Sequence, residues 1–551
     1  MQLRFVKGKN FRDYVVIENL ETKNDFQIQE VIRNVVSREE YKPFMKKGSF
    51  DKYIRYSYMF NNTIFPYQFW DDVKKVLSKT IGFLCKESDL VLVDDPYEKG
   101  YYQTKIEHQE FYDWLYSLKL PEDISVDDEK YEYQPESALR AINAHVARIE
   151  VATAGGKTFL TYLYCKALME LIKIKGKILI IVPSQILAKQ LKEDFYHYDS
   201  MNDFDQQLTV ETIYANSKRL VGAEIICGTY QSLCNYDEDY FNDFSVCVCD
   251  ELHRAKAYSI RNGIYAKLKN VEYFFGMTGT FPEYKSLDYL HIVSMFGPEV
   301  MNVPARLLMD TGVANYTTIK IIELEYYNSD TTNKDDKVEN MYQILKDFPN
   351  THPEYMESYP DLEIPNEEAD EKWNNPSLRY YMEKYYFQHN TGRLKILSNL
   401  INKFDENSII FVDTVEYCGE IYDYITARNQ DPDKKFFIIH GKVKGRDEII
   451  ETVKNTPNKC VIIATYGTMS IGVSIKNLTN AYIVDGGRSS NRIRQSIGRL
   501  MRIIENKKTS KLFDFYDNIK GSSFKKQGLT RRRIYNDNKF DVTTFKMRVL
   551  K

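Results

Sequence analysis

The chain has 551 residues and a formal net charge of −3, which suits three or four domains and does not by itself indicate a nucleic-acid binder. Its first residues lack the apolar run of a signal peptide, and no stretch approaches the ~18 apolar residues of a membrane span. The 8 cysteines include no pair at zinc-site spacing, which argues against structural zinc and fits a reducing compartment. We therefore expect a soluble, cytoplasmic protein without a membrane partner.

Residues 1–120 mix short strand patterns with a helical one, which predicts a small α+β domain. The pattern favours a strand at 53–58 and a helix at 67–78. Aromatic residues interleaved with Lys52 and Arg55 suit stacking on nucleic-acid bases, but aromatic residues also favour strands and cores. We expect an accessory domain and leave DNA binding or simple packing open as its role.

A β/α alternation follows an acidic linker at 121–130 and predicts a nucleotide-binding sheet within residues 121–315. Apolar runs at 178–182, 224–227 and 246–249 each end in a polar loop. Continuous apolar strands between helices indicate a parallel sheet that is covered on both faces. Ligands of such sheets bind at the carboxyl ends of the strands, so we expect the chemistry in these loops.

Residues 152–158, with the sequence ATAGGKT, have the character of a phosphate-binding loop. Small residues let backbone N–H groups approach phosphates, and the helix that follows adds its dipole. Lys157 is expected to reach the β- and γ-phosphates, and Thr158 to hold Mg²⁺. Because Val151 replaces the first glycine of the strict GxxxxGK[ST] pattern, a small-residue turn before a helix is the alternative interpretation.

Two adjacent acids, Asp250 and Glu251, directly follow the apolar run that ends at residue 249. In phosphoryl transfer, one such acid binds Mg²⁺ and the other activates the attacking water. We assign these roles to Asp250 and Glu251 in that order. His253 is then expected to sense the γ-phosphate and to link the acids to the next loop.

That next loop is the glycine-rich turn at 276–280, which carries two hydroxyl groups, those of Thr278 and Thr280. We expect these hydroxyls to hydrogen-bond to the acid loop. A simple strand-ending turn explains the segment equally well.

A second β/α alternation at 391–517 predicts another parallel sheet, within a domain that spans 316–517. Residues 330–372 interrupt this domain with thirteen acidic residues, and their composition is typical of a surface insertion that is partly disordered. Expected strands lie at 408–412, 436–439, 461–464, 482–484 and 512–515.

Two basic features occur near the C-terminus. Arg499 and Arg502 share one face of a helix, where an arginine could serve as an arginine finger across a domain cleft, and a solvated basic face is the alternative. Residues 518–551 contain ten lysines and arginines but only Asp537 and Asp541 as acids. We expect this segment to be a basic tail that contacts phosphates, with a solvated tail as the alternative.

The motifs occur in an order that resembles superfamily 2 helicases and translocases, and in particular the UvsW-type DNA helicases of tailed phages. The resemblance covers nearly the whole chain and is strongest from 131 to 517. It rests on the segments at 133–134, 152–158 (motif I), 182–190 (Ia), 228–232, 250–253 (DELH, motif II), 278–280 (III), 409–414 (IV), 464–474 (V) and 495–502 (VI).

The resemblance implies an α/β fold of two tandem recA-like parallel-sheet domains with a small α+β N-terminal domain. It implies ATP and Mg²⁺ as cofactors. Nucleotide-binding residues would be Gln134, which reads adenine, Thr153, Ala154, Gly155, Gly156, Lys157, Thr158 and Gly472. Catalytic residues would be Lys157, Asp250, Glu251, Arg499 and Arg502, with Thr158 and Asp250 on the metal. Coupling residues would be His253, Thr278, Thr280 and Gln495, and DNA-binding residues Ser184, Gln185, Thr229, Thr414 and Thr465.

The same resemblance implies an ATP-dependent helicase or translocase that remodels branched or forked DNA in recombination, fork rescue and branch migration. Its partners would be DNA and recombination or replication proteins of a phage or its host, and we expect a monomer in the cytoplasm, that of the host if a phage encodes it. Three alternatives stay open: the motor subunit of a restriction system, an ATP-switched clamp on DNA structures without processive unwinding, and an RNA helicase.

Overall fold

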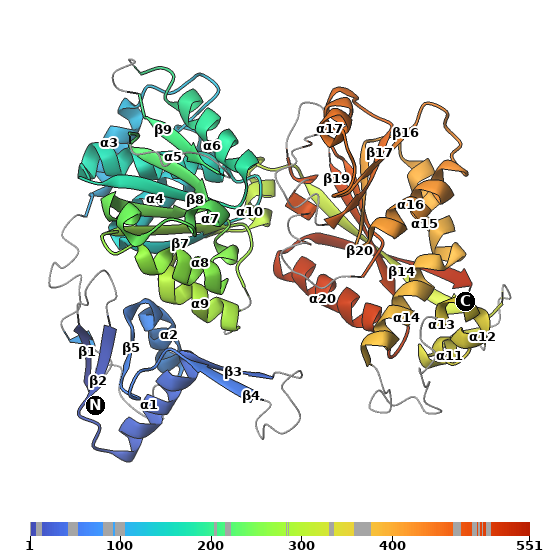
Figure 1. Ribbon diagram of the computed structural model, residues 1–551, viewed down its shortest axis with the longest axis horizontal. Coiled ribbons are helices and arrows are strands. Elements are labelled where there is room, and N and C mark those ends of the chain that lie inside the picture. The colour runs from blue at the N-terminus through green and yellow to red at the C-terminus, as the bar shows by residue number, and fades with distance from the viewer. Residues whose placement is uncertain are drawn as a thin grey trace. The chain divides into compact units, whose positions relative to one another are not determined.

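The computed structural model divides the chain into two compact units, Met1–Pro304 and Ala305–Lys551 (Figure 1). None of the helices in the described part of the chain is long and apolar enough to cross a membrane. The structure describes residues 2–6, 14–41, 53–80, 92–93, 105–202, 207–214, 222–282, 284, 286–329, 336–357, 376–466, 475, 477–486, 493, 496–498, 500–502 and 509–550.

The N-terminal part of the first unit is a small α+β domain. Its described strands form a mixed sheet in the order β5-β2-β1-β6, beside a separate β3–β4 hairpin. Thr22 caps the first helix, and Asp25 accepts a bond from the Thr22 N–H in return, so the helix begins in a capping box. The elements are β1 (Gln2–Val6), β2 (Tyr14–Glu18), α1 (Lys23–Val35), β3 (Ser37–Tyr41), β4 (Tyr53–Ser57), β5 (Ile64–Pro66), α2 (Trp70–Thr80) and β6 (Leu92–Val93).

The rest of the first unit is built on a parallel sheet. Among the described residues its strands lie in the order β13-β7-β12-β11-β8-β10-β9, and every neighbouring pair is parallel. The central strands are buried almost without interruption because helices cover both faces, as their apolar sequences require (Figure 1). The strands are β7 (Val146–Val151), β8 (Lys177–Val182), β9 (Val210–Ile213), β10 (Ile225–Thr229), β11 (Phe244–Cys249), β12 (Tyr273–Thr278) and β13 (Glu299–Val303).

Helices alternate with these strands along the chain. They are α3 (His108–Ser117), α4 (Tyr133–Ala144), α5 (Lys157–Ala167), α6 (Gln185–Tyr198), α7 (Tyr230–Leu233), α8 (Tyr258–Gly263) and α9 (Leu287–Phe296). Helix α9 also packs against the N-terminal domain, since Tyr289, Leu290 and Val293 share one buried apolar cluster with residues of that domain. Within the first unit, α9 therefore provides a packing surface for the N-terminal domain.

The second unit contains another parallel sheet, with its described strands in the order β16-β17-β15-β18-β19-β14-β20. All neighbouring pairs are parallel. The predicted fold class, two tandem parallel-sheet domains with a small α+β N-terminal domain, is confirmed. The strands are β14 (Thr317–Tyr327), β15 (Ser408–Val412), β16 (Lys435–Ile439), β17 (Cys460–Thr465), β18 (Asn480–Ile483), β19 (Ser510–Asp517) and β20 (Asp541–Leu550).

The acidic stretch at 330–372 and the basic segment at 518–551 were predicted from their composition to be an insertion and a tail. The described parts of both belong to the second unit. Residues 336–357, from the acidic stretch, place Met341, Leu345 and Phe348 in the core of the unit. Residues 518–550 form α20 and the edge strand β20 rather than a free tail. The helices are α10 (Ala305–Asp310), α11 (Tyr342–Leu345), α12 (Phe348–Thr351), α13 (Pro353–Met356), α14 (Pro376–His389), α15 (Thr391–Lys403), α16 (Val415–Thr426), α17 (Arg446–Asn455) and α20 (Ser523–Asp537).

Candidate active site

The loops of the first unit that were predicted to carry the nucleotide chemistry meet at one edge of its sheet. Strands β7, β12 and β11 are consecutive neighbours, with Glu150 paired to Thr278 and Gly276 paired to Cys249. Because the strands are parallel, the loops that follow them leave from the same edge. The phosphate loop, the acid pair and the turn at 278–280 are thus brought together although they are far apart in the sequence.

The phosphate loop depends on glycine at position 156. Gly156 is the N-cap of α5 and has φ +71°, in the left-handed region that favours glycine. A Cβ atom there would also lie 2.2 Å from Nε2 of Gln134. Ala154 adopts φ +75° two residues earlier, so the loop turns sharply before it enters the helix at Lys157.

Gln134 packs against this loop from α4. Its Nε2 donates to the carbonyl oxygen of Gly155 at 3.2 Å, and the hydroxyl of Tyr133 donates to the same oxygen at 2.7 Å. Sequence reasoning gave Tyr133 no role of its own, although it stands next to Gln134. Both residues fix the backbone of the loop, and adenine reading by Gln134 stays a prediction.

The turn at 278–280 lies close to the start of the phosphate loop. A Cβ atom on Gly279 would come within 3.3 Å of Oγ1 of Thr153. Thr158 lies in the first turn of α5, directly after Lys157. The structure therefore places Thr153 and Thr158 at the same edge as the acid pair.

The acid loop continues β11 and then turns abruptly. The N–H of Asp250 still donates to Ile181 on the neighbouring strand β8, at 2.9 Å. Glu251 has φ +52°, a conformation that is rare for a residue other than glycine and that clusters at functional sites. The turn separates the two carboxylates: Asp250 accepts a bond from the Glu251 N–H at 2.9 Å, while Glu251 points to His253.

Glu251, His253 and Thr278 form a compact triad of contacts. Nδ1 of His253 lies 3.2 Å from Oε2 of Glu251 and 3.1 Å from Oγ1 of Thr278. The Thr278 hydroxyl lies 3.4 Å from the same Glu251 oxygen and accepts the N–H of Thr280 at 3.1 Å. His253, Thr278 and Thr280 are buried, and these three side chains connect the acid loop to the turn, while their role in coupling stays a prediction.

The electrostatics differ between the two acids. Burial, and then the negative charge of Glu251, raise the pKa of Asp250. Burial alone would also raise the pKa of Glu251, but the bond to His253 and the charge of Lys157 lower it overall. A cation beside Asp250 would restore its ionised form, which fits a divalent metal there.

The metal would not be held by protein carboxylates alone. No cluster of three or more His, Cys, Asp or Glu side chains suited to a metal occurs in the described part of the chain. Magnesium in nucleotide sites is bound by one or two protein groups together with substrate phosphates. Thr158 and Asp250 fit that description because they lie at the same edge as the phosphate loop.

The residues predicted to bind DNA lie at the carboxyl ends of neighbouring β-strands within each unit. Ser184 caps α6 directly after β8, while Thr229 ends the adjacent strand β10 and bonds to Ser232 at 3.1 Å. In the second unit, Thr414 caps α16 after β15, and Thr465 ends the adjacent strand β17. Gln185 is the first residue of α6.

The remaining predicted residues belong to the second unit. Gly472, Gln495 and Arg499 lie outside the described residues. Arg502 is described and partly buried, and burial lowers the pKa of its guanidinium group. Its role as an arginine finger stays a prediction.

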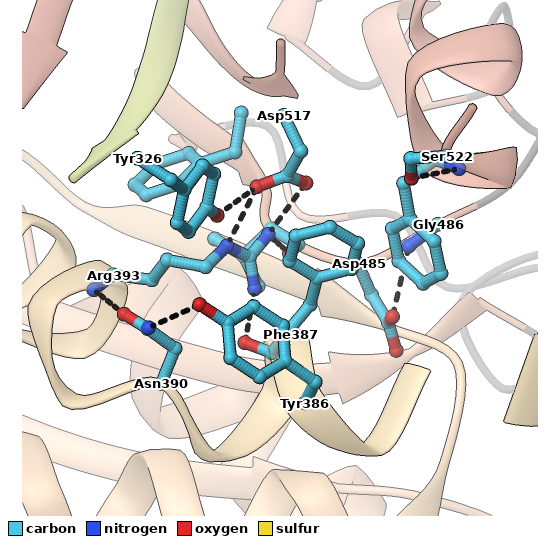
Figure 2. A network of polar contacts seen from close by, with 12 residues as sticks. Tyr326, Tyr386, Phe387, Asn390, Arg393, Asp485, Gly486, Asp517 and Ser522 are labelled. Carbon is cyan, nitrogen blue, oxygen red and sulfur yellow. Dashed lines mark hydrogen bonds and ion pairs between the residues drawn. The ribbon is translucent and has the colours of Figure 1, made fainter. Parts of the chain in front are cut away.

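A buried polar network at the carboxyl edge of the second sheet was not foreseen (Figure 2). Arg393 donates to Asp517 at 3.0 and 3.1 Å and to the carbonyl of Val484 at 2.8 Å. Asp485 accepts bonds from the N–H groups of Gly486 and Asp413 at 2.8 and 3.2 Å. Asp485 thereby connects the loop that carries Thr414 to the loop after β18. The sequence feature that could have revealed Asp485 is an acid after an apolar strand, the same feature that indicated Asp250.

Two family models match the chain. The model described as type III restriction enzyme, res subunit, matches residues 128–283, which include the phosphate and acid loops. The model described as helicase conserved C-terminal domain matches residues 392–504, which include β15 to β18.

The relatives with similar sequences are named helicases. The ATP-dependent DNA helicase uvsW of enterobacteria phage T4 is 24% identical over 451 residues, which are 79% of this chain and 81% of that protein. The RNA helicase NPH-II of vaccinia virus (strain Copenhagen) is 39% identical over 82 residues, which are 15% of this chain and 11% of that protein.

Among solved structures, a fragment of a putative HsdR subunit of a type I restriction enzyme from Vibrio vulnificus shares the fold. It superimposes with a TM-score of 0.52 at 14% identity, over 78% of this chain and 72% of that one. The ordered motifs, the two parallel-sheet domains and the two family models lead to one assignment. The chain carries two helicase-type domains and resembles the UvsW-type DNA helicases of tailed phages, which supports an ATP-dependent helicase of superfamily 2.

Proposed function

We propose that this helicase acts on branched or forked DNA and remodels it at the expense of ATP. The triad of Glu251, His253 and Thr278, which joins the acid loop to the turn at 278–280, supports the coupling of ATP hydrolysis to movement, and the likeness to a DNA helicase supports DNA as the substrate. A relative that aligns with 79% of the chain is named a DNA helicase, whereas the alignments with viral RNA helicases cover 14–22% of the chain.

In the hydrolysis step, each residue of the first unit has a distinct task. Lys157 binds the β- and γ-phosphates at the start of α5, where backbone N–H groups and the helix dipole add to its charge. Glu251, held as a carboxylate by His253, orients and deprotonates the attacking water. Thr158 and Asp250 would hold Mg²⁺, which supplies neutralisation of phosphate charge when it is bound with ATP.

In the coupling step, a change at the γ-phosphate reaches the turn at 278–280 through His253. This histidine contacts both the carboxylate of Glu251 and the hydroxyl of Thr278, so a movement of the acid loop can be passed to the turn through His253. Ser184 and Thr229 on one sheet, and Thr414 and Thr465 on the other, then bind strand phosphates. Helix N-termini at Ser184 and Thr414 suit that task because their N–H groups and dipoles favour anions.

The proposal is tested with four substrates of matched length: a four-way DNA junction, a forked DNA duplex, a plain DNA duplex and an RNA duplex. Strand displacement is followed in the presence of ATP and Mg²⁺. We expect displacement on the junction and the fork, and little on the plain duplex. ATP hydrolysis without any displacement would favour the clamp instead, and preferential displacement of RNA would favour the RNA helicase.

A further inference from the structure

The turn at 278–280 is in physical contact with the N-terminal domain through a short chain of side chains. Its first member is Phe281, the residue directly after Thr280. The N–H of Phe281 lies 3.4 Å from Oε1 of Glu150, on the strand that leads into the phosphate loop. Its ring is partly buried against two apolar clusters, that of the parallel-sheet domain and that of the N-terminal domain.

Arg148 occupies the centre of this chain. It is buried on β7, and its guanidinium carbon lies 4.8 Å from the ring centre of Phe281 and 5.5 Å from that of Tyr289. Its Nη1 also donates to the carbonyl oxygen of Gly297 at the end of α9. A buried cation within reach of two aromatic rings is attracted to both of them, so Arg148 links Phe281 to Tyr289.

Tyr289 completes the connection to the N-terminal domain. Its ring meets that of Phe281 edge to face, with ring centres 5.6 Å apart. Its hydroxyl accepts from Nη2 of Arg148 at 3.4 Å and donates to Oδ2 of Asp72 on α2 at 2.6 Å. One tyrosine thus bonds to an arginine on β7, the strand that leads into the phosphate loop, and to a carboxylate of another domain.

A second polar contact also joins the N-terminal domain to α9. The Tyr58 hydroxyl lies 2.5 Å from Nδ1 of His291 on α9, and Nη1 of Arg261 lies 3.0 Å from the same nitrogen. This contact involves α8 and α9 but no residue of the turn at 278–280. It can therefore hold the N-terminal domain in place while the contact through Tyr289 changes.

We propose that Phe281, Arg148 and Tyr289 are positioning residues that transmit the nucleotide state of the turn at 278–280 to α2 of the N-terminal domain. When the turn moves with the γ-phosphate, Phe281 must move with it because the two are adjacent in the backbone. The bond between Tyr289 and Asp72 then passes this displacement to α2. The inference rests on the proposed role of Thr278 and Thr280 in coupling.

The experiment is hydrogen–deuterium exchange of the full chain, with and without the non-hydrolysable analogue AMP-PNP and Mg²⁺. The variant Tyr289→Phe keeps the ring on Arg148 and Phe281 and removes only the hydroxyl. We expect AMP-PNP to change exchange in α2 of the unsubstituted protein and to have at most a tenth of that effect in Tyr289→Phe. Basal ATPase should stay within twofold, while unwinding of forked DNA should fall severalfold.

Matched variants on α2 separate this role from a general loss of stability. Asp72→Ala should reproduce the effect of Tyr289→Phe, whereas Asp72→Asn retains an acceptor for the hydroxyl and should behave as the unsubstituted protein. Asp71→Ala removes the neighbouring carboxylate, which contacts Lys74 instead, and should change nothing.

An α2 response that persists unchanged in both Tyr289→Phe and Asp72→Ala would overturn the inference. Failure of the proposed function has a different signature. In that case the unsubstituted protein would hydrolyse ATP without separating forked DNA, whatever happens to exchange in α2.

Discussion

At the scale of single residues, the candidate active site depends on how β11 ends. The sequence predicts Asp250, Glu251 and His253 as functional because two acids directly follow a buried apolar strand. The structure adds that Glu251 adopts φ +52°, which separates its carboxylate from that of Asp250 and directs it to His253. No local pattern predicts this backbone conformation, because one of the side chains that Glu251 reaches, Thr278, comes from another strand.

The first prediction concerns hydrolysis. Glu251→Gln removes the base that orients water but retains the shape of the side chain, so ATP turnover should fall by a factor of about 10²–10⁴ while nucleotide binding persists. Lys157→Ala should lose both turnover and binding of the phosphates. Steady-state ATPase and titration with a fluorescent nucleotide distinguish the two cases, and substantial turnover in both variants would refute the site assignment.

The second prediction concerns the phosphate loop. Gly156→Ala forces a Cβ atom into a left-handed conformation and toward Gln134, at a conformational cost of about 1–2 kcal/mol. Nucleotide affinity should therefore fall by roughly tenfold or more. Gly419→Ala is the control, because nothing lies within 4 Å of that position and it is inside α16. Equal affinities in the two variants would show that the loop tolerates a side chain.

At the scale of elements, apolar runs predicted the central strands of both sheets because those strands are buried on both faces. The same reasoning missed β20, whose sequence DVTTFKMRVL has no apolar run and is mostly exposed. That strand forms by pairing with β14, more than 200 residues earlier, and such a pairing leaves no local signal. Composition likewise could not show that Met341 and Phe348, within the acidic stretch, enter the core.

The third prediction concerns α20, because its basic residues do not all serve the same purpose. Arg531 is fully buried and bonds to Asp514 at 2.8 Å, so Arg531→Ala should destabilise the unit by about 3–5 kcal/mol. Lys526 and Arg533 lie on the same helix and are exposed. Thermal or denaturant unfolding measures the first effect.

For DNA binding, the double variant Lys526→Glu, Arg533→Glu should weaken affinity and reduce the slope of log K against log salt by about 1–2. Lys454→Glu on α17 serves as a control for a charge change on another helix. An identical salt slope in the double variant and the unsubstituted protein would show that α20 does not contact phosphate. Deletion of residues 519–551 is a poorer test, since it would also remove an edge strand from the sheet.

At the scale of the whole molecule, the order of motifs predicted two tandem parallel-sheet domains and a small N-terminal domain, and the structure confirms that architecture. The sequence left open whether the N-terminal domain only packs on the motor. The structure shows that it packs on α9, where Tyr58 and Asp72 make polar contacts with His291 and Tyr289. These contacts join residues more than 200 positions apart, so only the folded chain reveals them.

We expect ATP hydrolysis at this site to drive the remodelling of branched DNA. Strand separation of a four-way DNA junction by the purified protein, with Glu251→Gln as the matched control, tests this coupling. We predict that the unsubstituted protein separates the junction only when ATP and Mg²⁺ are present, and that Glu251→Gln binds the junction but leaves it intact. DNA-stimulated ATP hydrolysis by the unsubstituted protein, with the junction left whole, would contradict the claim.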